Sequence, residues 1–240
     1  MPSLPRPFRF LLTGIVVFVA AVALVACSSS DDGDDDAPAD LSTPRPTAAG
    51  GSAPPSAPAA APGTCTGPGI AAIPRDNAKR YSAPEQVIDA AKSYTAVVKT
   101  NKGDITIQLA AVQAPKTVNS FVFLACHGFY DNITWHRVVA NFVIQTGDPV
   151  GNPPGTGGPG YTFGLEISDL KHDTAGSLGM ARSQDPNSNG SQWYITTAVN
   201  ASTANLDGQY TVFGKVTQGM DVVTQIRQGD RVNSVSITEQ

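Results

Sequence analysis

The stretch between Thr134 and Gln145 constrains the fold of this chain more than any other. It predicts two short β-strands, Thr134–Val139 and Phe142–Gln145, joined by a tight connection at Ala140-Asn141. β-Branched and aromatic residues dominate both segments, as they do in half-buried strands. The two segments are therefore expected to form the central hairpin of a β-sheet.

Arg137 is the unusual residue of this hairpin, because an unpaired charge is costly to bury in a sheet. Regular alternation would place Arg137 on one strand face with Trp135 and Val139. Together with Phe142 and Gln145 on the next strand, it indicates an apolar pocket with one fixed cluster of hydrogen-bond donors. The alternative is an arginine at a strand edge in a surface salt bridge, and the hairpin alone does not decide between the two.

Residues 1–27 have the composition of a secretory signal. Arg6 and Arg9 precede an uncharged and largely apolar run that ends in Leu24-Val25-Ala26-Cys27. That tetrapeptide resembles the lipobox of bacterial lipoproteins, which implies lipid on Cys27 and cleavage before it. The protein would then be held by its lipid on the extracytoplasmic face of the cell membrane. The alternative is an uncleaved anchor, since about 17 apolar residues approach the length that spans a bilayer.

Residues 28–63 predict a disordered linker. The acidic run 31–36 is followed by a tract rich in Pro, Ala, Gly and Ser, and such a composition cannot bury enough apolar surface to offset the entropy lost on ordering. A calcium-binding loop is the alternative, but the acidic run lacks the spaced ligands of such a loop and its final glutamate. An extended spacer between lipid and domain is the better interpretation.

The charge balance excludes a nucleic-acid-binding surface. Of the 16 basic and 20 acidic residues, three basic and six acidic residues lie in residues 1–60. Residues 61–240 therefore carry a net charge of −1, which gives no electrostatic footprint for nucleic acid. They are numerous enough for one well-buried domain.

The rest of the chain predicts many short strands and two helices. Residues 64–93 look like an irregular N-terminal extension, punctuated by prolines. Further strands are expected over 94–100, 105–109, 177–181, 192–196, 211–216 and 234–238. One helix should begin at Pro115 and end at Gly128, buried nearly all round, and a second should cover Met220–Arg227. This pattern favours a β-barrel or sandwich with helices at its openings.

Four motifs resemble, in order, the signatures of one family. Trp135-His136-Arg137 with Phe142-x-x-Gln145-x-Gly147-Asp148 comes first, followed by Gly155-Thr156-Gly157-Gly158, by Met180-Ala181-Arg182 with 186–195, and by Leu206-Asp207-Gly208 with 212–216. Their order and spacing make residues 94–240 similar to the cyclophilins, the cyclosporin-type peptidyl-prolyl cis-trans isomerases.

The resemblance implies a fold and a site. The fold is mainly β, a closed eight-stranded antiparallel β-barrel capped by two α-helices. Arg137 would be the catalytic arginine, and Gln145 would assist it. The substrate-binding residues would be Phe142, Val143, Ala181, Arg182, Gln192, Tyr194, Leu206 and Tyr210. Neither a metal nor another cofactor is implied.

The implied activity is the isomerisation of X-Pro bonds in exported proteins as they fold, by a protein expected to be a monomer. The substrates would be proline-containing polypeptides. The alternative, from a different class, is a cyclophilin-like module that binds proline-containing segments as a chaperone or scaffold without turnover, and the presence of Arg137 argues against it. A purely structural envelope protein explains none of these residues.

Three residues depart from the family pattern. Tyr194 stands where the family usually has Phe, so its hydroxyl is expected to narrow the pocket. Tyr210 replaces a common His. Asn205 replaces a large aromatic residue, and the segment before it carries extra residues. The loss of that aromatic contact predicts weak cyclosporin binding.

The remaining polar residues receive structural interpretations. His136 is expected to hydrogen-bond the backbone through its ring. His127 and His172 are expected in loops, since no cluster of His, Cys and carboxylates has the spacing of a metal site. Asp148 and Glu166 are expected to brace loops rather than to act as an acid–base pair.

The cysteines predict one disulfide. With lipid on Cys27, Cys65 and Cys126 remain as an even pair in an oxidising compartment. Nothing local is expected to hold the segment around Cys65 in place, so a bridge to Cys126 would pin it to the barrel. The alternative is two free thiols, with Cys126 a small buried apolar residue.

Overall fold

The structure is a computed structural model that describes residues 61–240. The expected signal sequence, Cys27 and all but the last residues of the expected linker lie outside the described residues. Within residues 61–240, no helix combines the length and the apolar character needed to cross a membrane.

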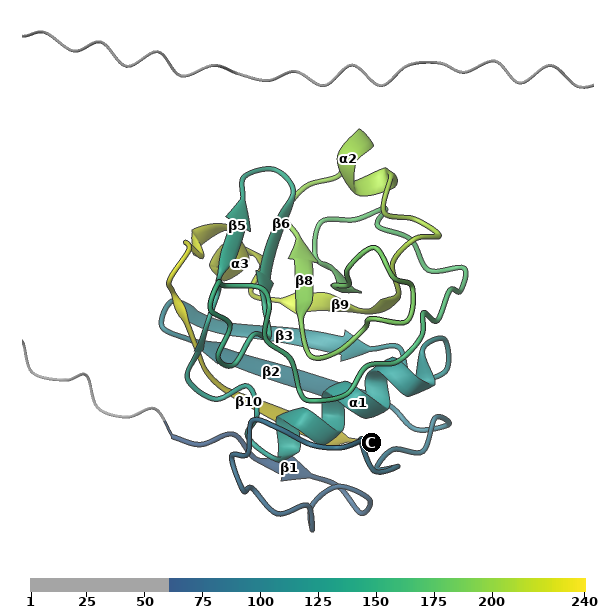
Figure 1. The fold of residues 1–240 in the computed structure, drawn as a ribbon, viewed down its shortest axis with the longest axis vertical. Helices are drawn as coiled ribbons and strands as arrows, with labels where there is room; N and C mark the ends of the chain where they lie inside the picture. The colour runs from purple at the N-terminus through teal and green to yellow at the C-terminus, as the bar shows by residue number, and fades with distance from the viewer. Residues whose placement is uncertain (1–60) are drawn as a thin grey trace, which may run out of the picture. The chain divides into compact units, whose positions relative to one another are not determined.

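One curled, ten-stranded sheet forms the body of the described chain (Figure 1). Its strands are Cys65–Thr66 (β1), Tyr94–Thr100 (β2), Gly103–Leu109 (β3), Ile133–Thr134 (β4), Arg137–Val139 (β5), Val143–Thr146 (β6), Ser177–Met180 (β7), Trp193–Thr196 (β8), Val212–Gln218 (β9) and Arg231–Glu239 (β10). The hydrogen-bonded order is β1-β10-β2-β3-β9-β7-β8-β6-β5, with β4 paired to β10 beside this path. Every pairing is antiparallel except that of β1 with β10.

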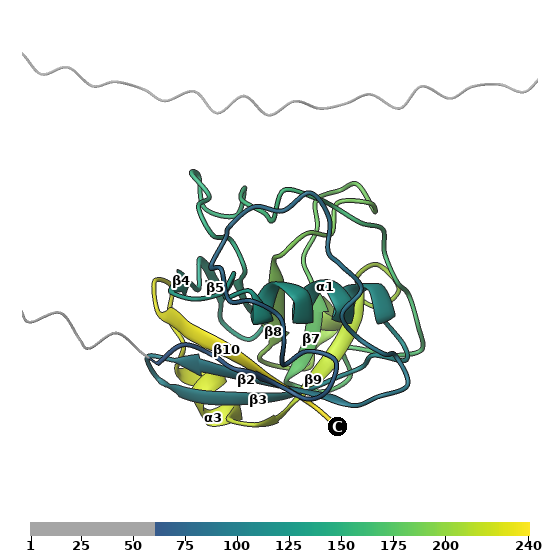
Figure 2. The ribbon, with the colours of Figure 1, turned by 90° about the horizontal axis from the view of Figure 1, so that it is seen from below.

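The expected mainly-β architecture is therefore present, but the pairings do not show a closed ring of eight strands. The path ends at β5, and no ladder joins β5 to β10. Three helices are present instead of two: Pro115–Cys126 (α1), Ala201–Ala204 (α2) and Met220–Gln225 (α3). α1 and α3 lie on opposite sides of the strands β10, β2 and β3 (Figure 2). The unexpected α2 is formed by the extra residues before Asn205, and Asn200 caps it with a capping box.

The expected strand over residues 134–139 is broken at Trp135-His136. The backbone of Trp135 bonds the turn at residues 229–230 instead of a neighbouring strand: its N–H donates to the Asp230 carbonyl, 2.8 Å away, and its carbonyl accepts from the Gly229 N–H, 2.9 Å away. Regular alternation is lost at this break. The prediction that Trp135 and Arg137 share a face is therefore wrong, because Trp135 is fully buried whereas Arg137 is exposed.

Helix α1 is buried along almost its whole length, as its sequence predicts. Its N-terminus has no capping side chain of its own. Glu166 takes this role from a distant loop, because its carboxylate accepts from the N–H groups of Lys116 and Thr117 at 2.9 and 2.6 Å. A carboxylate at this end also complements the helix dipole. Glu166 therefore braces a loop against the helix, as expected.

The N-terminal extension, residues 61–93, is irregular apart from β1 and is held to the domain by several contacts. A disulfide joins Cys65 to Cys126, so the expected bridge is present. Arg75 forms a two-pronged ion pair with Asp131. Lys79 donates to the carbonyls of the turn after α1. The segment around Cys65 is also held by the pairing of β1 with β10, so the disulfide is one of several ties between the extension and the domain.

Candidate active site

The site is built on a row of residues that crosses four adjacent strands. Arg137 on β5 lies opposite Gln145 on β6, Gln145 lies opposite Tyr194 on β8, and Tyr194 lies opposite Gly179 on β7. The side chain of Tyr194 lies over Gly179, where an added Cβ would come within 2.2 Å of the tyrosine ring. Only glycine therefore leaves room for this ring at the base of the site.

A hollow of about 240 Å³ lies beside this row. Its lining residues are Arg137, Phe142, Val143, Gln145, Ala181, Arg182, Tyr194, Leu206 and Tyr210. All of them are residues that the sequence predicts for the site, although they come from three strands and three loops. Gln192 is the exception: it does not line this hollow but contacts a residue that does.

Arg137 is exposed at the rim of the hollow, so the argument from the cost of burying its charge is wrong. One of its Nη atoms donates to Oε1 of Gln145 at 3.3 Å, and its guanidinium lies 5.7 Å from the ring centre of Phe142. Within residues 61–240 it forms no ion pair, so the alternative of a surface salt bridge is not observed. The remaining N–H groups of its rigid fork are free of carboxylates and face solvent.

Gln192 connects the row to the glycine-rich loop. Its Oε1 accepts from Nε2 of Gln145 at 3.0 Å, and its Nε2 donates to the carbonyls of Gly155 and Gly157, each at 2.8 Å. Gln192 also lines a second, larger hollow of about 850 Å³, which shares Gln145, Ala181 and Arg182 with the first. Arg80 of the N-terminal extension lines this second hollow, and no sequence pattern indicated that it would.

The side chain of Asp148 holds the glycine-rich loop in place and is almost fully buried. Its carboxylate accepts four backbone N–H groups, from Val150 and Gly151 on one oxygen and from Gly155 and Gly157 on the other. Burial by itself raises the pKa of Asp148, but these four donors outweigh it and the pKa is lowered overall. Asp148 therefore braces a loop, as expected.

We expect Asp148→Asn to lower the free energy of unfolding at pH 7 by about 1–3 kcal/mol, since the amide NH₂ faces backbone donors that then lack an acceptor. The direction in which the stability changes with pH follows from the lowered pKa of Asp148. Stability from the ionised carboxylate is present above its ordinary pKa of 3.8 and is lost as the pH falls through the lower folded value. The difference between wild type and variant, measured by urea unfolding, should therefore shrink between pH 4 and pH 2 (roughly the span of such a transition).

The exposed Asp169 offers a matched control. Asp169→Asn should leave the urea midpoint almost unchanged at both pH values, as surface substitutions usually do. If Asp148→Asn also left the urea midpoint unchanged at pH 7, the carboxylate of Asp148 would not be what holds the loop.

The outer wall of the first hollow is formed by the segment after α2. Leu206 and Tyr210 belong to it, and the guanidinium of Arg182 lies 4.8 Å from the ring centre of Tyr210. Nε of Arg182 also donates to the Gln209 carbonyl at 2.9 Å. The side chain of Arg182, which follows β7, thus connects that side of the hollow to its outer wall. The sequence did not indicate this role.

His136 lacks its expected contact, whereas His172 lies in a loop as expected but forms contacts that the sequence did not indicate. Neither ring nitrogen of His136 has a hydrogen-bond partner among the described residues, so the expected bond to the backbone is wrong. Burial lowers the pKa of His136, although the nearby charge of Asp148 opposes the change. His172 is buried between Asp207 and Tyr194. The hydroxyl of Tyr194 could have indicated this contact, because a buried phenol needs a hydrogen-bond partner.

The comparisons with known proteins agree with this geometry. A family model described as "Cyclophilin type peptidyl-prolyl cis-trans isomerase/CLD" matches residues 95–240. A peptidyl-prolyl cis-trans isomerase of Helicobacter pylori is 41% identical over 164 residues, which cover 67% of this chain and 95% of that relative. Peptidyl-prolyl cis-trans isomerase 9 of Schizosaccharomyces pombe is 46% identical over 139 residues, but these are 56% of this chain and only 22% of that relative.

Solved structures are similar as well. A crystal structure of a cyclophilin-type isomerase of Cryptosporidium parvum is 31% identical, with a TM-score of 0.55 over 60% of this chain and 97% of that one. A second structure of the same protein, determined in the presence of the dipeptide Ala-Pro, is 32% identical with a TM-score of 0.53. The family match, the relatives and the nine residues that meet around one hollow lead to a single conclusion: this chain belongs to the cyclophilin-type peptidyl-prolyl cis-trans isomerases.

Proposed function

We propose that this chain isomerises X-Pro peptide bonds in exported proteins as they fold. The observation that carries the proposal is the guanidinium of Arg137, which lies at the rim of a hollow lined by Phe142, Val143 and Leu206. The cyclophilin structure determined with Ala-Pro supports proline-containing substrates. The protein would act as a monomer.

The chemistry requires little besides this arrangement. Rotation about a peptide bond meets a barrier of roughly 18–20 kcal/mol, because the nitrogen lone pair is delocalised into the carbonyl. A catalyst must hold the twisted amide better than either planar form. The apolar hollow would fix the proline ring. The N–H groups of Arg137 would then favour a lone pair localised on the prolyl nitrogen, and Gln145 would orient the guanidinium through the bond between them.

The test of turnover is a protease-coupled assay on a proline tetrapeptide with residues 28–240 as the enzyme. We expect the cis-to-trans rate constant to rise in proportion to the protein concentration. Saturable binding of the peptide without any rate increase would instead support the alternative, a module that binds proline-containing segments as a chaperone or scaffold.

The export of this protein is part of the proposal. The lipobox at Leu24-Val25-Ala26-Cys27 supports a lipid on Cys27 and a position on the extracytoplasmic face of the cell membrane. Residues 28–63 would then be the linker, residues 64–93 the extension and residues 94–240 the isomerase domain. The Cys65–Cys126 disulfide supports an oxidising compartment. We also infer that β4 and β5, two parts of one interrupted strand, close the barrel, since β4 pairs with β10 and β5 with β6.

Cyclosporin should bind weakly. Asn205 stands where the family has a large aromatic residue; it is exposed at the end of α2 and does not line the hollow. Loss of such a contact at a binding hot spot typically costs at least about 2 kcal/mol.

We therefore expect Asn205→Trp to tighten cyclosporin binding by tenfold or more (about 1.4 kcal/mol per tenfold), measured by calorimetry, while kcat/KM changes little. Nanomolar binding by the wild type would show that another residue takes the place of the aromatic ring.

A further inference from the structure

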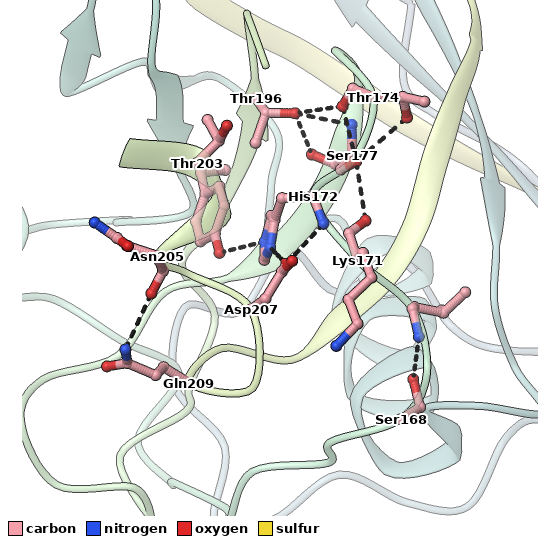
Figure 3. Close-up of polar contacts among 12 residues, drawn as sticks. Ser168, Lys171, His172, Thr174, Ser177, Thr196, Thr203, Asn205, Asp207 and Gln209 are labelled. Atoms are coloured by element: carbon pink, nitrogen blue, oxygen red, sulfur yellow. Dashed lines mark hydrogen bonds and ion pairs between the residues drawn. The ribbon is translucent and has the colours of Figure 1, made fainter. Parts of the chain in front are cut away.

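A buried histidine that the proposed chemistry does not use links two sides of the proline hollow. His172 is 1% exposed. Its Nδ1 lies 2.8 Å from Oδ1 of Asp207, and its Nε2 lies 3.0 Å from the hydroxyl of Tyr194. Its own backbone N–H donates to the same Asp207 oxygen, also at 2.8 Å. Figure 3 shows His172 with its ring and backbone both turned toward Asp207.

The chemistry of the three groups fixes the direction of these bonds. An ionised carboxylate can only accept a hydrogen bond, so Nδ1 of His172 must be protonated and must donate to Asp207. Burial raises the pKa of Tyr194, so its phenol stays protonated. Burial also raises the pKa of Asp207, but the bonds from the backbone and ring of His172 reverse the effect and keep this carboxylate ionised. In the neutral ring, Nε2 then accepts from the hydroxyl of Tyr194.

The two partners of His172 belong to segments on different sides of the hollow. Tyr194 lies on β8 and forms its base, whereas Asp207 directly follows Leu206 in the segment that forms the outer wall. The His172 loop is itself fixed to the sheet, since the Ser177 hydroxyl donates to the Lys171 carbonyl at 3.4 Å and to the Thr174 carbonyl at 2.9 Å (Figure 3). The Asp207-His172-Tyr194 chain thus sets the separation between base and wall.

We propose that His172 is a positioning residue that, through Tyr194 and Asp207, sets the width of the proline hollow and so restricts it to five-membered rings. The inference rests on the proposed isomerase activity. His172 itself lines no part of the hollow and would act only through its two partners. The tyrosine ring packs on Gly179, and its hydroxyl bonds Nε2 of His172, so both contacts restrain the ring while the chain is intact.

The test compares a prolyl peptide with its pipecolyl analogue, whose ring has one additional methylene group. A closely fitting apolar pocket discriminates one methylene by about 10- to 200-fold. Three variants break the chain, two of them at the bond to Tyr194 and one at the ring bond to Asp207. Tyr194→Phe removes the hydroxyl, and His172→Asn keeps a side-chain donor for Asp207 but loses the bond to Tyr194. His172→Gln keeps a polar group for Tyr194 but loses the side-chain bond to Asp207, whose bond from the backbone N–H remains.

We expect each variant to raise the pipecolyl-to-prolyl ratio of kcat/KM by about threefold to tenfold, a part of the discrimination that one methylene allows. The double variant Tyr194→Phe/His172→Asn should raise it no further than either single change, since both break the same bond. His127→Asn is the matched control: His127 is also buried and also lies beside a carboxylate, that of Asp76 at 3.3 Å, but it does not line the hollow. It should leave the ratio unchanged.

A purely structural role predicts a different outcome. General destabilisation lowers the amount of active protein and therefore lowers both rates equally, so the ratio stays at its wild-type value while the melting temperature falls. Unchanged ratios in all three variants would overturn the positioning role. A wild type that accelerates neither peptide would instead refute the isomerase activity itself.

Discussion

Arg137→Ala should lower kcat/KM for a prolyl peptide by about 100-fold or more, the loss typical when a donor to the transition state is removed. The fold should be unaffected. Arg137 is exposed on the three-residue strand β5, and its removal leaves Gln145 beside solvent and still bonded to Gln192. The hollow would therefore still bind the proline ring but would lack the group that stabilises the twisted amide.

Arg137→Lys separates the charge from the geometry. A lysine keeps the positive charge as a point on a flexible chain, but it cannot present two N–H groups in a fixed plane. We expect it to recover less than a tenth of the lost activity (about 1.4 kcal/mol per tenfold). Full recovery would mean that only the electrostatic field matters.

The exposed Arg227 provides the control for a changed arginine. Within residues 61–240 its side chain hydrogen-bonds only the carbonyls of Thr224 and Ile226 at its own helix end, so Arg227→Ala should keep wild-type kcat/KM. Circular dichroism and thermal melting would show that both alanine variants are folded. A folded Arg137→Ala protein with near-normal kcat/KM would contradict the proposed mechanism.

Much of the site was predictable from the sequence, because its residues belong to motifs with fixed spacing. The elements that carry them were also predictable where the pattern was regular. Tyr94–Thr100 and Gly103–Leu109 form the expected hairpin, and the apolar α1 is buried as its composition indicates. In these segments local preference and tertiary packing agree.

The errors occur where distant contacts override the local pattern. Trp135 leaves the strand because its backbone bonds residues 229–230, which no local rule reveals. The alternation argument therefore failed at Arg137, although the motif that selected this residue places it beside the hollow. His172 was assigned to a loop without a role, because its partners lie 22 and 35 positions away in the sequence. Spacing rules for helices and strands do not reach such distances.

The N-terminal extension is the other part that the sequence described incompletely. Its prolines and lack of periodicity correctly predict irregular structure. They do not reveal that Asn119 of α1 bonds the backbone at Glu85, Val87 and Ile88, or that Tyr81 contacts Phe123 with ring centres 5.0 Å apart. These contacts join α1 to an irregular segment, and such contacts leave no period in the sequence.

Replacing both cysteines of the bridge, Cys65→Ala/Cys126→Ala, is expected to lower the free energy of unfolding by about 3–4 kcal/mol. The bridge spans 61 positions, and cross-links across long loops restrict the unfolded chain most. A loss of this size corresponds to a fall of roughly 10 °C in the melting temperature of a domain of this length.

The activity should survive the loss of the bridge. Neither cysteine lines the hollow, and the extension keeps its pair between Arg75 and Asp131 and the bonds of Lys79. We therefore expect kcat/KM at 25 °C to stay within about twofold of wild type, as for changes away from a site. Limited proteolysis should cut residues 61–93 faster in the variant, because without the disulfide this segment can detach locally from the domain.

Reduction of the wild type separates the bridge from the packing of its sulfur atoms. Cys126 is 2% exposed, so its replacement by Ala also removes buried contacts, whereas a reductant leaves both side chains in place. Reduced wild type and the double variant should both melt well below the oxidised protein, with the variant slightly lower. Two reactive thiols in denatured, unreduced protein from an oxidising compartment would show that the bridge does not form there. An unchanged melting temperature on reduction would show instead that the non-covalent contacts, among them those of Arg75, Lys79 and Asn119, are enough to hold the extension to the domain.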